Sequence, residues 1–287
     1  MRREVNSVTL RNLLADKLDP QELKILYKSY DIIGEIAVVR IPESLINKSQ
    51  LIAEAIMQTH KRIKTILRQT SPVHNEFRLR KLEWIAGEKK TETVHKEYGC
   101  IFKVNLEKCY FSPRLSYERM RITKQVHPNE IIVNMFAGVG CYSILIAKYS
   151  EARKIYSIDL NPDAVRYMIE NTQLNKVQNR VVVIQGDAKK VIQQTLKNTA
   201  HRVLMPLPEK AFEYLSYALL TLKAGGGWIH YYAFEHAKKP ESPLEKVKEK
   251  VLKKLQELNV NFKISSSRIV RAVGPNWYQI NLDVLIK

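Results

Sequence analysis

The chain has 287 residues, of which 45% are apolar and 26% are charged, and these proportions exclude a largely disordered protein. Its net charge of +18 and isoelectric point near 9.7 favour a polyanionic partner, because basic side chains release counterions from phosphates. The three cysteines, Cys100, Cys109 and Cys141, form no CxxC pair, so we expect neither a disulfide framework nor a metal site. No apolar run reaches about 18 residues and no signal-peptide core opens the chain, so we expect a cytoplasmic protein without a membrane segment.

Short helical and strand patterns fill the first hundred or so residues. We expect amphipathic helices within residues 1–30, the second of them opening at Asp19-Pro20, and one strand over residues 33–42. A helix is predicted over residues 45–61, and strands are predicted in RIKTILRQT, RLRKLEWIAG and the pair around TVHKEYGCIFKVNL. These elements predict an α+β domain over residues 1–116.

A basic stretch lies inside this domain. Between His60 and Lys90, nine Lys and Arg residues outnumber three acids, and Phe77 and Trp84 are interleaved with them. One interpretation is a solvated sheet face. The other is a surface that follows phosphates and stacks on a flipped base, which would make this the RNA-contacting domain.

Strands and helices alternate from about Tyr117 onward. The helix YERMRITKQV is followed by strands and helices in turn, and this order predicts a doubly wound parallel sheet. Two strand patterns joined at Gly274-Pro275 end the chain, and a terminal hairpin on a parallel sheet is typical of class I methyltransferases. We therefore predict a Rossmann-like α/β domain over residues 117–287, preceded by the smaller α+β domain.

The segment IIVNMFAGVGCYSILIAKYSEARKIYSIDLNP has the pattern of a nucleotide-binding βαβ unit. Gly138 and Gly140 form a turn after an apolar strand, and Asp159 ends the next strand, where a carboxylate can accept hydrogen bonds from ribose. A dinucleotide fingerprint would have its third glycine at Ser143, so S-adenosylmethionine, which has no phosphates, is favoured. The alternative is an ordinary glycine turn, because short glycine patterns recur by chance.

Two further strand ends carry candidate ligand contacts. Asp187, in QGDA, is placed for the adenine edge, although an acid at a strand end is often only a helix cap. Pro206 and Pro208 flank one residue after the next strand, and their carbonyls are free to accept because prolyl nitrogens donate nothing. The alternative for this pair is a stiff connection between a strand and a helix.

The chain resembles, over essentially its full length, the archaeal and eukaryotic tRNA guanine-N1 methyltransferases that modify guanosine next to the anticodon, and their relatives in wybutosine synthesis. The matching stretches are IIGEIAVVRIP, FRLRKLEWIAGE, TVHKEYGCIFKVNLEKCYFSPRLSYERMRI, MFAGVG, IDLNP, RVLMPLP and IHYY. The long central stretch is the specific one, since a glycine turn alone recurs in many proteins.

The resemblance implies roles for individual residues. It makes Glu118 the base that removes the N1 proton, and Arg114 and Arg78 the cations that hold O6 or a phosphate. It also implies that Tyr110 lines the cofactor and base pocket. The matched stretches add Phe136, Gly138, Gly140, Asp159, Leu160, Pro206 and Pro208 to the cofactor-binding residues. Without the resemblance, Glu118 would be interpreted as a solvated helix charge paired with Arg121 or Arg114.

The sequence departs from the family pattern at three places. Asn134 stands where many relatives have Asp, and Pro206 stands where many single-function methyltransferases have Asn. A Pro-x-Pro version occurs in relatives that also methylate carbon 7 of the tricyclic wyosine precursor. The resemblance starts near the first residue, so we expect no extra amino-terminal domain of the kind that many relatives use to hold the tRNA elbow.

These observations predict methyl transfer from S-adenosylmethionine to N1 of guanosine 37 in tRNA. Carbon-7 methylation of the wyosine precursor, alone or in addition, is the first alternative. Aminocarboxypropyl transfer is less favoured, because Arg114-Leu115 and the Pro-Leu-Pro stretch are typical of the methyltransferases. An RNA-binding protein with a vestigial cofactor fold is the non-enzymatic alternative, and the intact Gly138, Asp159 and Glu118 argue against it.

Overall fold

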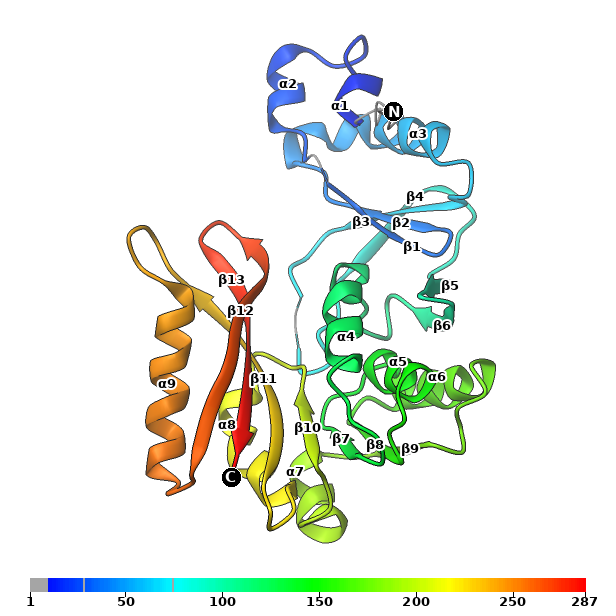
Figure 1. Ribbon diagram of the computed structural model, residues 1–287. Coiled ribbons are helices and arrows are strands. Elements are labelled where there is room, and N and C mark those ends of the chain that lie inside the picture. Colours follow the sequence, from blue (N-terminus) through cyan, green and yellow to red (C-terminus); the bar gives the residue numbers. More distant parts are fainter. Residues whose placement is uncertain (1–9, 28, 74) are drawn as a thin grey trace, which may run out of the picture. The chain divides into compact units, whose positions relative to one another are not determined.

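The computed structural model describes residues 10–27, 29–73 and 75–287, and contacts within it divide the chain into two compact units. The first unit comprises residues 1–97 and 101–113, and the second comprises residues 98–100 and 114–287. Figure 1 traces both units by colour along the chain.

The first unit opens with two short helices, α1 (Leu10–Leu13) and α2 (Pro20–Ile25). Asp19 caps α2 as predicted: its carboxylate accepts from the N–H groups of Gln21 and Glu22, and the Glu22 carboxylate accepts from the Asp19 N–H. This reciprocal box satisfies backbone donors that a helix start leaves without partners. The part of the expected helical region that falls on residues 1–9 and 28 lies outside the described residues.

A small sheet with the strand order β1-β2-β3-β4 forms the body of the first unit. Its strands are β1 (Asp31–Ile33), β2 (Ile36–Val39), β3 (Thr65–Gln69) and β4 (Leu82–Gly87). The prediction of one strand over residues 33–42 was wrong, because Gly34 turns the chain at φ +57° and separates β1 from β2. A 3₁₀ turn (Glu43–Lys48) and helix α3 (Ser49–Thr59) connect β2 to β3. The unit also contains β5 (Glu92–Glu97) and most of β6 (Cys100–Asn105), which form a two-stranded sheet.

The second unit contains a mostly parallel sheet with the strand order β12-β13-β11-β10-β7-β8-β9. Its strands are β7 (Ile131–Asn134), β8 (Lys154–Asp159), β9 (Val181–Gln185), β10 (Arg202–Met205), β11 (Gly227–His236), β12 (Phe262–Gly274) and β13 (Trp277–Ile286). β13 runs antiparallel to both of its neighbours, β11 and β12, and β12–β13 is the predicted terminal hairpin. The order reverses after β7, so the ends of β7 and β10 form the switch point at which such sheets bind ligands.

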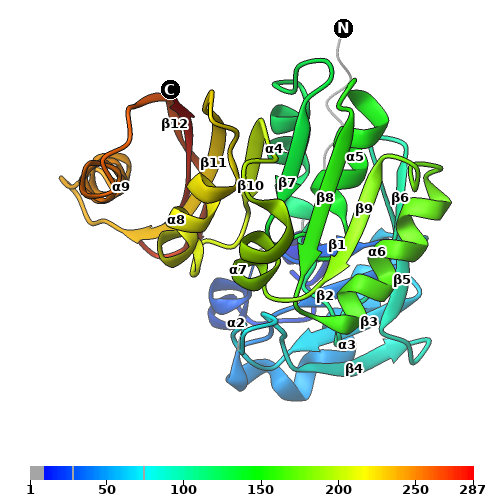
Figure 2. The same cartoon turned by 90° about the horizontal axis from the view of Figure 1, so that it is seen from below.

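Helices cover both faces of this sheet, as Figures 1 and 2 show. They are α4 (Ser116–Thr123), α5 (Cys141–Tyr149), α6 (Pro162–Leu174), α7 (Ala188–Val191), which continues as a π-helix (Ile192–Leu196), α8 (Ala211–Thr221) and α9 (Pro243–Glu257). Helices α7, α8 and α9 pack their apolar side chains on one face, against residues such as Val203, Ile229 and Leu282. Helices α4 and α5 lie against each other on the opposite face. The predicted α/β class, a Rossmann-like methyltransferase fold, is confirmed.

Helix α4 is shorter than the stretch YERMRITKQV predicts. It ends at Thr123, and the N–H groups of Gln125 and Val126 then donate to carbonyls three residues back, at Ile122 and Thr123. Such tightening is usual at the last turn of a helix, and Pro128 follows closely. The short helix places its charged residues against the sheet next to β11 and β13.

Candidate active site

The glycine turn lies between β7 and α5, at the switch point of the sheet. Gly138 adopts φ +57° and its N–H donates to Asp159 Oδ2 at 2.6 Å. A Cβ built on Gly138 would have no heavy atom within 4 Å, so the space above this position is open. Gly140 caps α5 at φ +92°, but its Cβ would meet Met168 Cγ at 3.0 Å and Ile144 Cδ1 at 3.1 Å. Gly138 therefore faces room for a ligand, whereas Gly140 allows close helix packing.

Asp159 ends β8 and joins the glycine turn to the next helix. Its Oδ1 accepts from the Asn161 N–H at 3.0 Å, while Oδ2 accepts from Gly138. Burial raises the pKa of this carboxyl, and backbone hydrogen bonds from Asn161, Gly138 and Leu160 partly oppose that rise. Each carboxylate oxygen has a second lone pair, so the group can still accept from a ribose hydroxyl. Leu160 follows with a side chain 44% exposed, an apolar surface beside the acid.

Tyr214, which the sequence pattern does not indicate as a site residue, contacts both Asp187 and Phe136. Asp187 caps α7 by accepting from the Lys189 N–H at 2.8 Å, and it also accepts from the Tyr214 hydroxyl at 3.2 Å. The Tyr214 ring packs edge-on against Phe136, with centroids 5.2 Å apart. Burial, together with Asp187, raises the pKa of Tyr214 to about 12. Asp187 is thus both a helix cap and part of the strand-end cluster.

The ends of β7 and β10 carry Asn134 and the two prolines. Pro206 is half-buried and Pro208 is buried, directly after β10. Asn134 is fully buried, and its Nδ2 donates to Ser143 Oγ at 3.1 Å while its Oδ1 has no partner among the described residues. We call the group formed by Phe136, Gly138, Gly140, Asp159, Leu160 and Asp187 the glycine edge.

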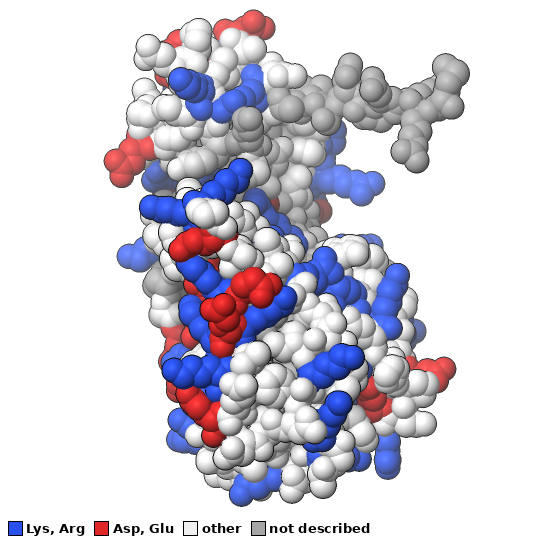
Figure 3. All heavy atoms as spheres, turned by 60° about the vertical axis from the view of Figure 1, so that its left-hand side comes forward, with Lys and Arg blue, Asp and Glu red and all other residues white. Residues whose placement is uncertain are grey.

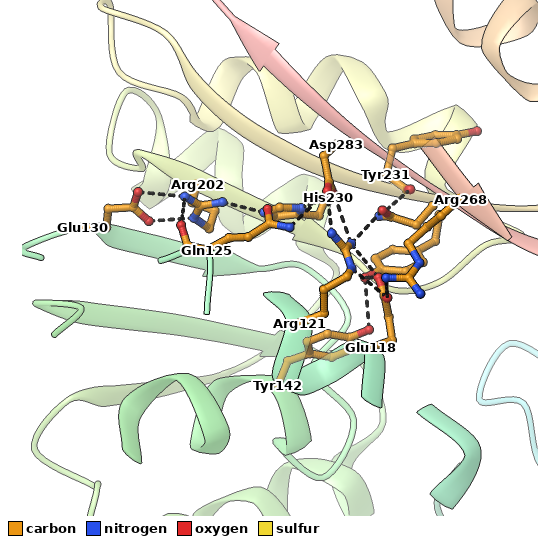
Figure 4. A network of polar contacts seen from close by, with 12 residues as sticks. Glu118, Arg121, Gln125, Glu130, Tyr142, Arg202, His230, Tyr231, Arg268 and Asp283 are labelled. Atoms are coloured by element: carbon orange, nitrogen blue, oxygen red, sulfur yellow. Dashed lines mark hydrogen bonds and ion pairs between the residues drawn. The ribbon is translucent and has the colours of Figure 1, made fainter. Parts of the chain in front are cut away.

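Glu118 lies on α4 with its side chain only 2% exposed (Figure 4). Arg121 Nε and Nη2 donate to the two carboxylate oxygens at 2.9 and 2.7 Å, and the Tyr232 hydroxyl donates to Oε1 at 2.8 Å. Arg268 Nη1 lies 3.7 Å from Oε2. The expected pairing of Glu118 with Arg121 is present, but it is buried and not solvated. The side chain is therefore held at a fixed place by partners on α4, β11 and β12.

A chain of polar contacts continues from Arg121 across the sheet. Arg121 Nη1 donates to Asp283 Oδ2 at 2.6 Å, and Asp283 Oδ1 accepts from His230 Nδ1 at 2.6 Å. His230 Nε2 in turn accepts from Arg202 Nη1 at 2.6 Å. Arg202 Nε donates to Glu130 Oε2 at 2.6 Å, which ends the chain. We call these residues, with Glu118, Tyr232, Arg268 and Asn281, the polar face (Figure 4).

The protonation states on the polar face follow from its contacts. Burial lowers the pKa of His230 below its usual range, although Asp283 opposes this shift. A neutral ring fits the geometry, because Nδ1 donates to Asp283 and Nε2 accepts from Arg202. Burial alone would raise the pKa of Asp283, but hydrogen bonds from His230 and Arg121 outweigh it and the pKa is lowered. Asp283 is therefore ionised and His230 neutral near pH 7.

The remaining predicted residues lie elsewhere in the chain. Arg114 is exposed, in the 3₁₀ turn (Pro113–Leu115) that precedes α4. In the first unit, the Arg78 guanidinium stacks over the Tyr110 ring at 4.3 Å from its centroid. The cations that the structure places on Glu118 are Arg121 and Arg268, neither of which was predicted as catalytic. The roles of Arg114, Arg78 and Tyr110 stay predictions.

One sequence signal could have pointed to the polar face. In β13, the positions Ile280, Leu282 and Val284 belong to the apolar core, while Asn281 and Asp283 between them are also buried. A strand with apolar residues on one face and buried polar residues on the other requires polar partners on that second face. Arg202 and His230 gave no comparable signal, since each is isolated in its own strand.

The residues that the structure describes contain neither a candidate membrane-spanning helix nor a candidate metal-binding cluster. Within residues 10–27, 29–73 and 75–287, no helix is long and apolar enough to cross a membrane. The same ranges contain no group of His, Cys, Asp and Glu side chains that could hold a metal ion.

Comparison with known proteins supplies a family. The TRM5/TYW2 methyltransferase domain matches residues 93–260, and the TYW2 N-terminal domain matches residues 10–91. The tRNA (guanine(37)-N(1))-methyltransferase Trm5b of Pyrococcus abyssi is 41% identical over 266 residues, which cover 92% of this chain and 77% of that protein. The tRNA 4-demethylwyosine(37)-methyltransferase Taw21 of Saccharolobus solfataricus is 36% identical over 269 residues, covering 92% and 96%. Among solved structures, the complex of aTrm5 and tRNALeu has a TM-score of 0.84 at 33% identity, covering 99% of this chain and 79% of that one.

Proposed function

Because the chain belongs to the TRM5/TYW2 methyltransferase family, we propose that it methylates N1 of guanosine 37 in tRNA, with S-adenosylmethionine as methyl donor. The observation that carries the proposal is the buried carboxylate of Glu118 on α4, a helix that packs against α5, which begins directly after a glycine turn with open space for a ligand. A guanine N1 that carries a proton needs a base, and a carboxylate held at a fixed position by Arg121 and Tyr232 serves better than one that moves freely in water.

The residues of the glycine edge fit an adenosyl group. Gly138 leaves space where any side chain would intrude, and Asp159 keeps lone pairs for ribose hydroxyls. Leu160 offers an exposed apolar surface for a flat base, and Asp187 can accept from its exocyclic amine. When bound, S-adenosylmethionine supplies a methyl group on a positively charged sulfur.

Glu118 removes the N1 proton in the proposed reaction. The N1–H bond breaks toward the carboxylate, and the nitrogen pair that is set free forms the new bond to the methyl carbon. Negative charge builds on O6 during this step and is returned to the ring when the methyl group arrives, so cations near O6 lower the barrier. Tyr232 and Arg121 keep Glu118 aimed while it exchanges the proton.

We assign RNA contact to residues 1–116 and methyl transfer to residues 117–287. Arg78 stacked on Tyr110 offers a planar cation of the kind that contacts phosphates and bases. Trp84 in β4 is 43% exposed and provides a surface on which a base could stack. Figure 3 shows Lys and Arg spread over the viewed face of the molecule, with Asp and Glu in smaller groups, as a polyanionic partner requires. A tRNA substrate also assigns the activity to the cytoplasm.

A second candidate is methylation of carbon 7 of the wyosine precursor. It is favoured by Pro206, which stands where an Asn could contact the exocyclic amine of guanine. The 36% identical Taw21 of Saccharolobus solfataricus is named for that reaction. The same base and cofactor arrangement serves both acceptors, so the two activities can coexist on one site.

Nucleoside mass spectrometry after incubation with S-adenosylmethionine tests the proposal. The substrates are an unmodified tRNA with guanosine at position 37, the same tRNA with adenosine there, and a tRNA carrying the tricyclic precursor. We expect N1-methylguanosine from the first tRNA and no product from the second. A methyl group found only on the tricyclic base would replace the first candidate by the second, and an aminocarboxypropyl adduct would overturn both.

A further inference from the structure

The edge strand β12 changes register against β13, and the changes decide which of its side chains share a face. In a regular strand, residues three positions apart point to opposite faces. One extra residue between Ile269 and Arg271 forms a β-bulge, which brings Arg268 and Arg271 to the same face. Arg271 lies opposite Gln279 of β13, and its Nε donates to Gln279 Oε1 at 2.8 Å. A second guanidinium therefore continues the polar face along the hairpin.

Trp277 lies on this same side of the sheet, next to the hairpin turn. β11 and β13 pair without a register shift, so alternate residues of β13 share a face, and Trp277 shares it with Asn281. His236 of β11 is opposite Trp277, and their ring centroids are 5.3 Å apart. Trp277 is nevertheless 46% exposed. His236 thus supports the indole on one side, while nearly half of the residue remains open to solvent.

The charges beside the hairpin turn are mainly positive. Lys238 and Lys239 follow β11 directly, are exposed, and have no acidic partner in the part of the chain that the structure describes. The Ala237 N–H donates to the Asn276 carbonyl at 2.9 Å, so this loop lies beside the turn, as Figure 1 shows. The acids of β11 and of the loop after it are already paired with lysines: Glu235 with Lys250, and Glu241 with Lys246. A polyanion would therefore meet uncompensated positive charge here.

We propose that Arg271, Trp277, Lys238 and Lys239, which we call the hairpin platform, bind the RNA strand next to the target nucleotide. This inference rests on the proposed function and adds an RNA contact within residues 117–287. A nucleobase stacks on the open side of the Trp277 indole, and the three cations contact phosphates. An exposed indole among cations fits RNA better than a protein partner, because every nucleotide offers a flat base and a negative charge together.

The place of the hairpin platform fits a nucleotide that flanks the reacting one. Tyr232, which donates to Glu118, lies opposite Asn281 in the strand register. The proposed base is therefore level with Asn281, and Trp277 lies about 13 Å farther along the strand. A nucleotide turned out of its stack for reaction leaves neighbouring bases without a stacking partner. An aromatic ring can replace that partner, whichever base is present.

Affinity for an anticodon stem-loop RNA, measured with S-adenosylhomocysteine present, tests the proposal. Trp277→Ala should weaken binding about fivefold to a hundredfold, because the stacking of one base is lost, and Trp277→Phe should recover most of it. Arg271→Gln should lower the slope of log Kd against log salt by about one. The matched controls are Leu252→Ala and Lys253→Gln, on exposed positions of α9, which packs on the opposite face of the sheet. Both should leave affinity within about twofold.

RNAs that lack one base near position 37 locate the stack. On the RNA without the stacked base, Trp277→Ala should cost no further affinity, because its partner is already gone. The single-turnover rate of methylation at saturating RNA should stay within about twofold of wild type, because Trp277 binds the strand and does not touch the reacting atoms.

Three results would overturn the hairpin platform. One is an RNA affinity of Trp277→Ala equal to that of Leu252→Ala. Another is an equal loss on every RNA, with or without the missing base, which would make Trp277 a structural residue. The third is unchanged RNA affinity with altered sedimentation of the protein alone, which would make this surface an interface between copies of the chain. The wild-type protein separates the two proposals: if it forms no N1-methylguanosine, the proposed function fails, whereas the affinities still decide whether Trp277 contacts RNA.

Discussion

The glycine edge and the polar face hold their acids in opposite ways. At the glycine edge, Asp159 accepts from the backbone N–H groups of Gly138 and Asn161, and Asp187 accepts from that of Lys189. On the polar face, the partners of Glu118 and Asp283 are side chains, some of them more than 100 positions away. Backbone N–H donors hold a carboxylate in place without neutralising its charge, so the carboxylate can still accept hydrogen bonds from a ligand. Charged side-chain partners neutralise the carboxylate, so replacing one member of such a pair leaves the charge of the other member buried without a partner.

Glu118→Gln is the strongest way to test this difference. We expect the rate of methyl transfer to fall by about 10²- to 10⁴-fold, because the amide cannot take the N1 proton, while cofactor affinity stays the same. Stopped reactions at saturating tRNA and calorimetric titration measure the two quantities. Glu235→Gln is the control, since Glu235 is also buried but pairs with the exposed Lys250. Equal rates for the two variants would remove Glu118 from the role of base.

Asp283→Asn should destabilise the polar face itself. It leaves Arg121 and His230 without their shared carboxylate, and breaking a buried pair costs about 3–5 kcal/mol of unfolding free energy. Because the folded pKa of Asp283 is lowered, its contribution is complete above the unfolded value of about 3.9 and is lost as pH falls below it.

Urea unfolding at pH 7 and in acid measures this effect. The difference between wild type and Asp283→Asn should be large at pH 7 and should shrink in acid. The control, Glu170→Gln, removes a half-exposed pair with Arg166 and should cost less than about 1 kcal/mol. If Asp283→Asn lowered the free energy of unfolding at pH 7 by no more than Glu170→Gln does, the stabilising role of the network would be contradicted.

Asp159→Asn should affect the ligand more than the fold. The amide places an NH₂ group against one of two backbone donors and offers ribose a neutral acceptor, so cofactor affinity should fall about tenfold to a hundredfold. Calorimetry with S-adenosylmethionine measures the loss. Asp163→Asn, which removes an acid paired with Arg166 on α6, should leave affinity within about twofold. Equal affinities in both variants would exclude Asp159 as a cofactor contact.

Gly138→Ala and Gly140→Ala should have the smallest effects on stability and cofactor affinity. Comparing them tests whether each glycine leaves space for the ligand or allows close helix packing. Both place a Cβ at positive φ, which costs about 1–2 kcal/mol of stability. Gly140→Ala adds contacts at 3.0–3.1 Å with Met168 and Ile144, so its melting temperature should fall further. Gly138→Ala meets nothing within 4 Å and should instead weaken cofactor binding. A larger stability loss in Gly138→Ala than in Gly140→Ala would reverse this assignment.

The two regions were not equally predictable from sequence. The glycine edge could be predicted because Gly138 and Asp159 lie 21 positions apart in one βαβ unit, Gly138 in the turn after β7 and Asp159 at the end of β8. The place of Glu118 could be named by resemblance and its pairing with Arg121 from helix spacing, but its contact with Tyr232 and the contact of Arg121 with Asp283 could not, since β11 and β13 meet α4 only after the sheet has formed. Gly34 shows the converse failure: the alternating apolar pattern of residues 33–42 predicts one strand, although the left-handed turn at Gly34 ends β1 before β2 begins. Sequence spacing thus predicts backbone-held sites better than sites held by distant charges.

The separation of the two regions can be measured most directly by crossing Glu118→Gln with Asp159→Asn. Each variant, and the pair combined, is assayed for S-adenosylmethionine affinity and for the single-turnover rate at saturating cofactor. The account predicts that Glu118→Gln loses rate at wild-type affinity, and that Asp159→Asn loses affinity but regains most of its rate at saturation. If each variant lost both cofactor affinity and saturated rate to a similar degree, the separation of the two regions would be contradicted.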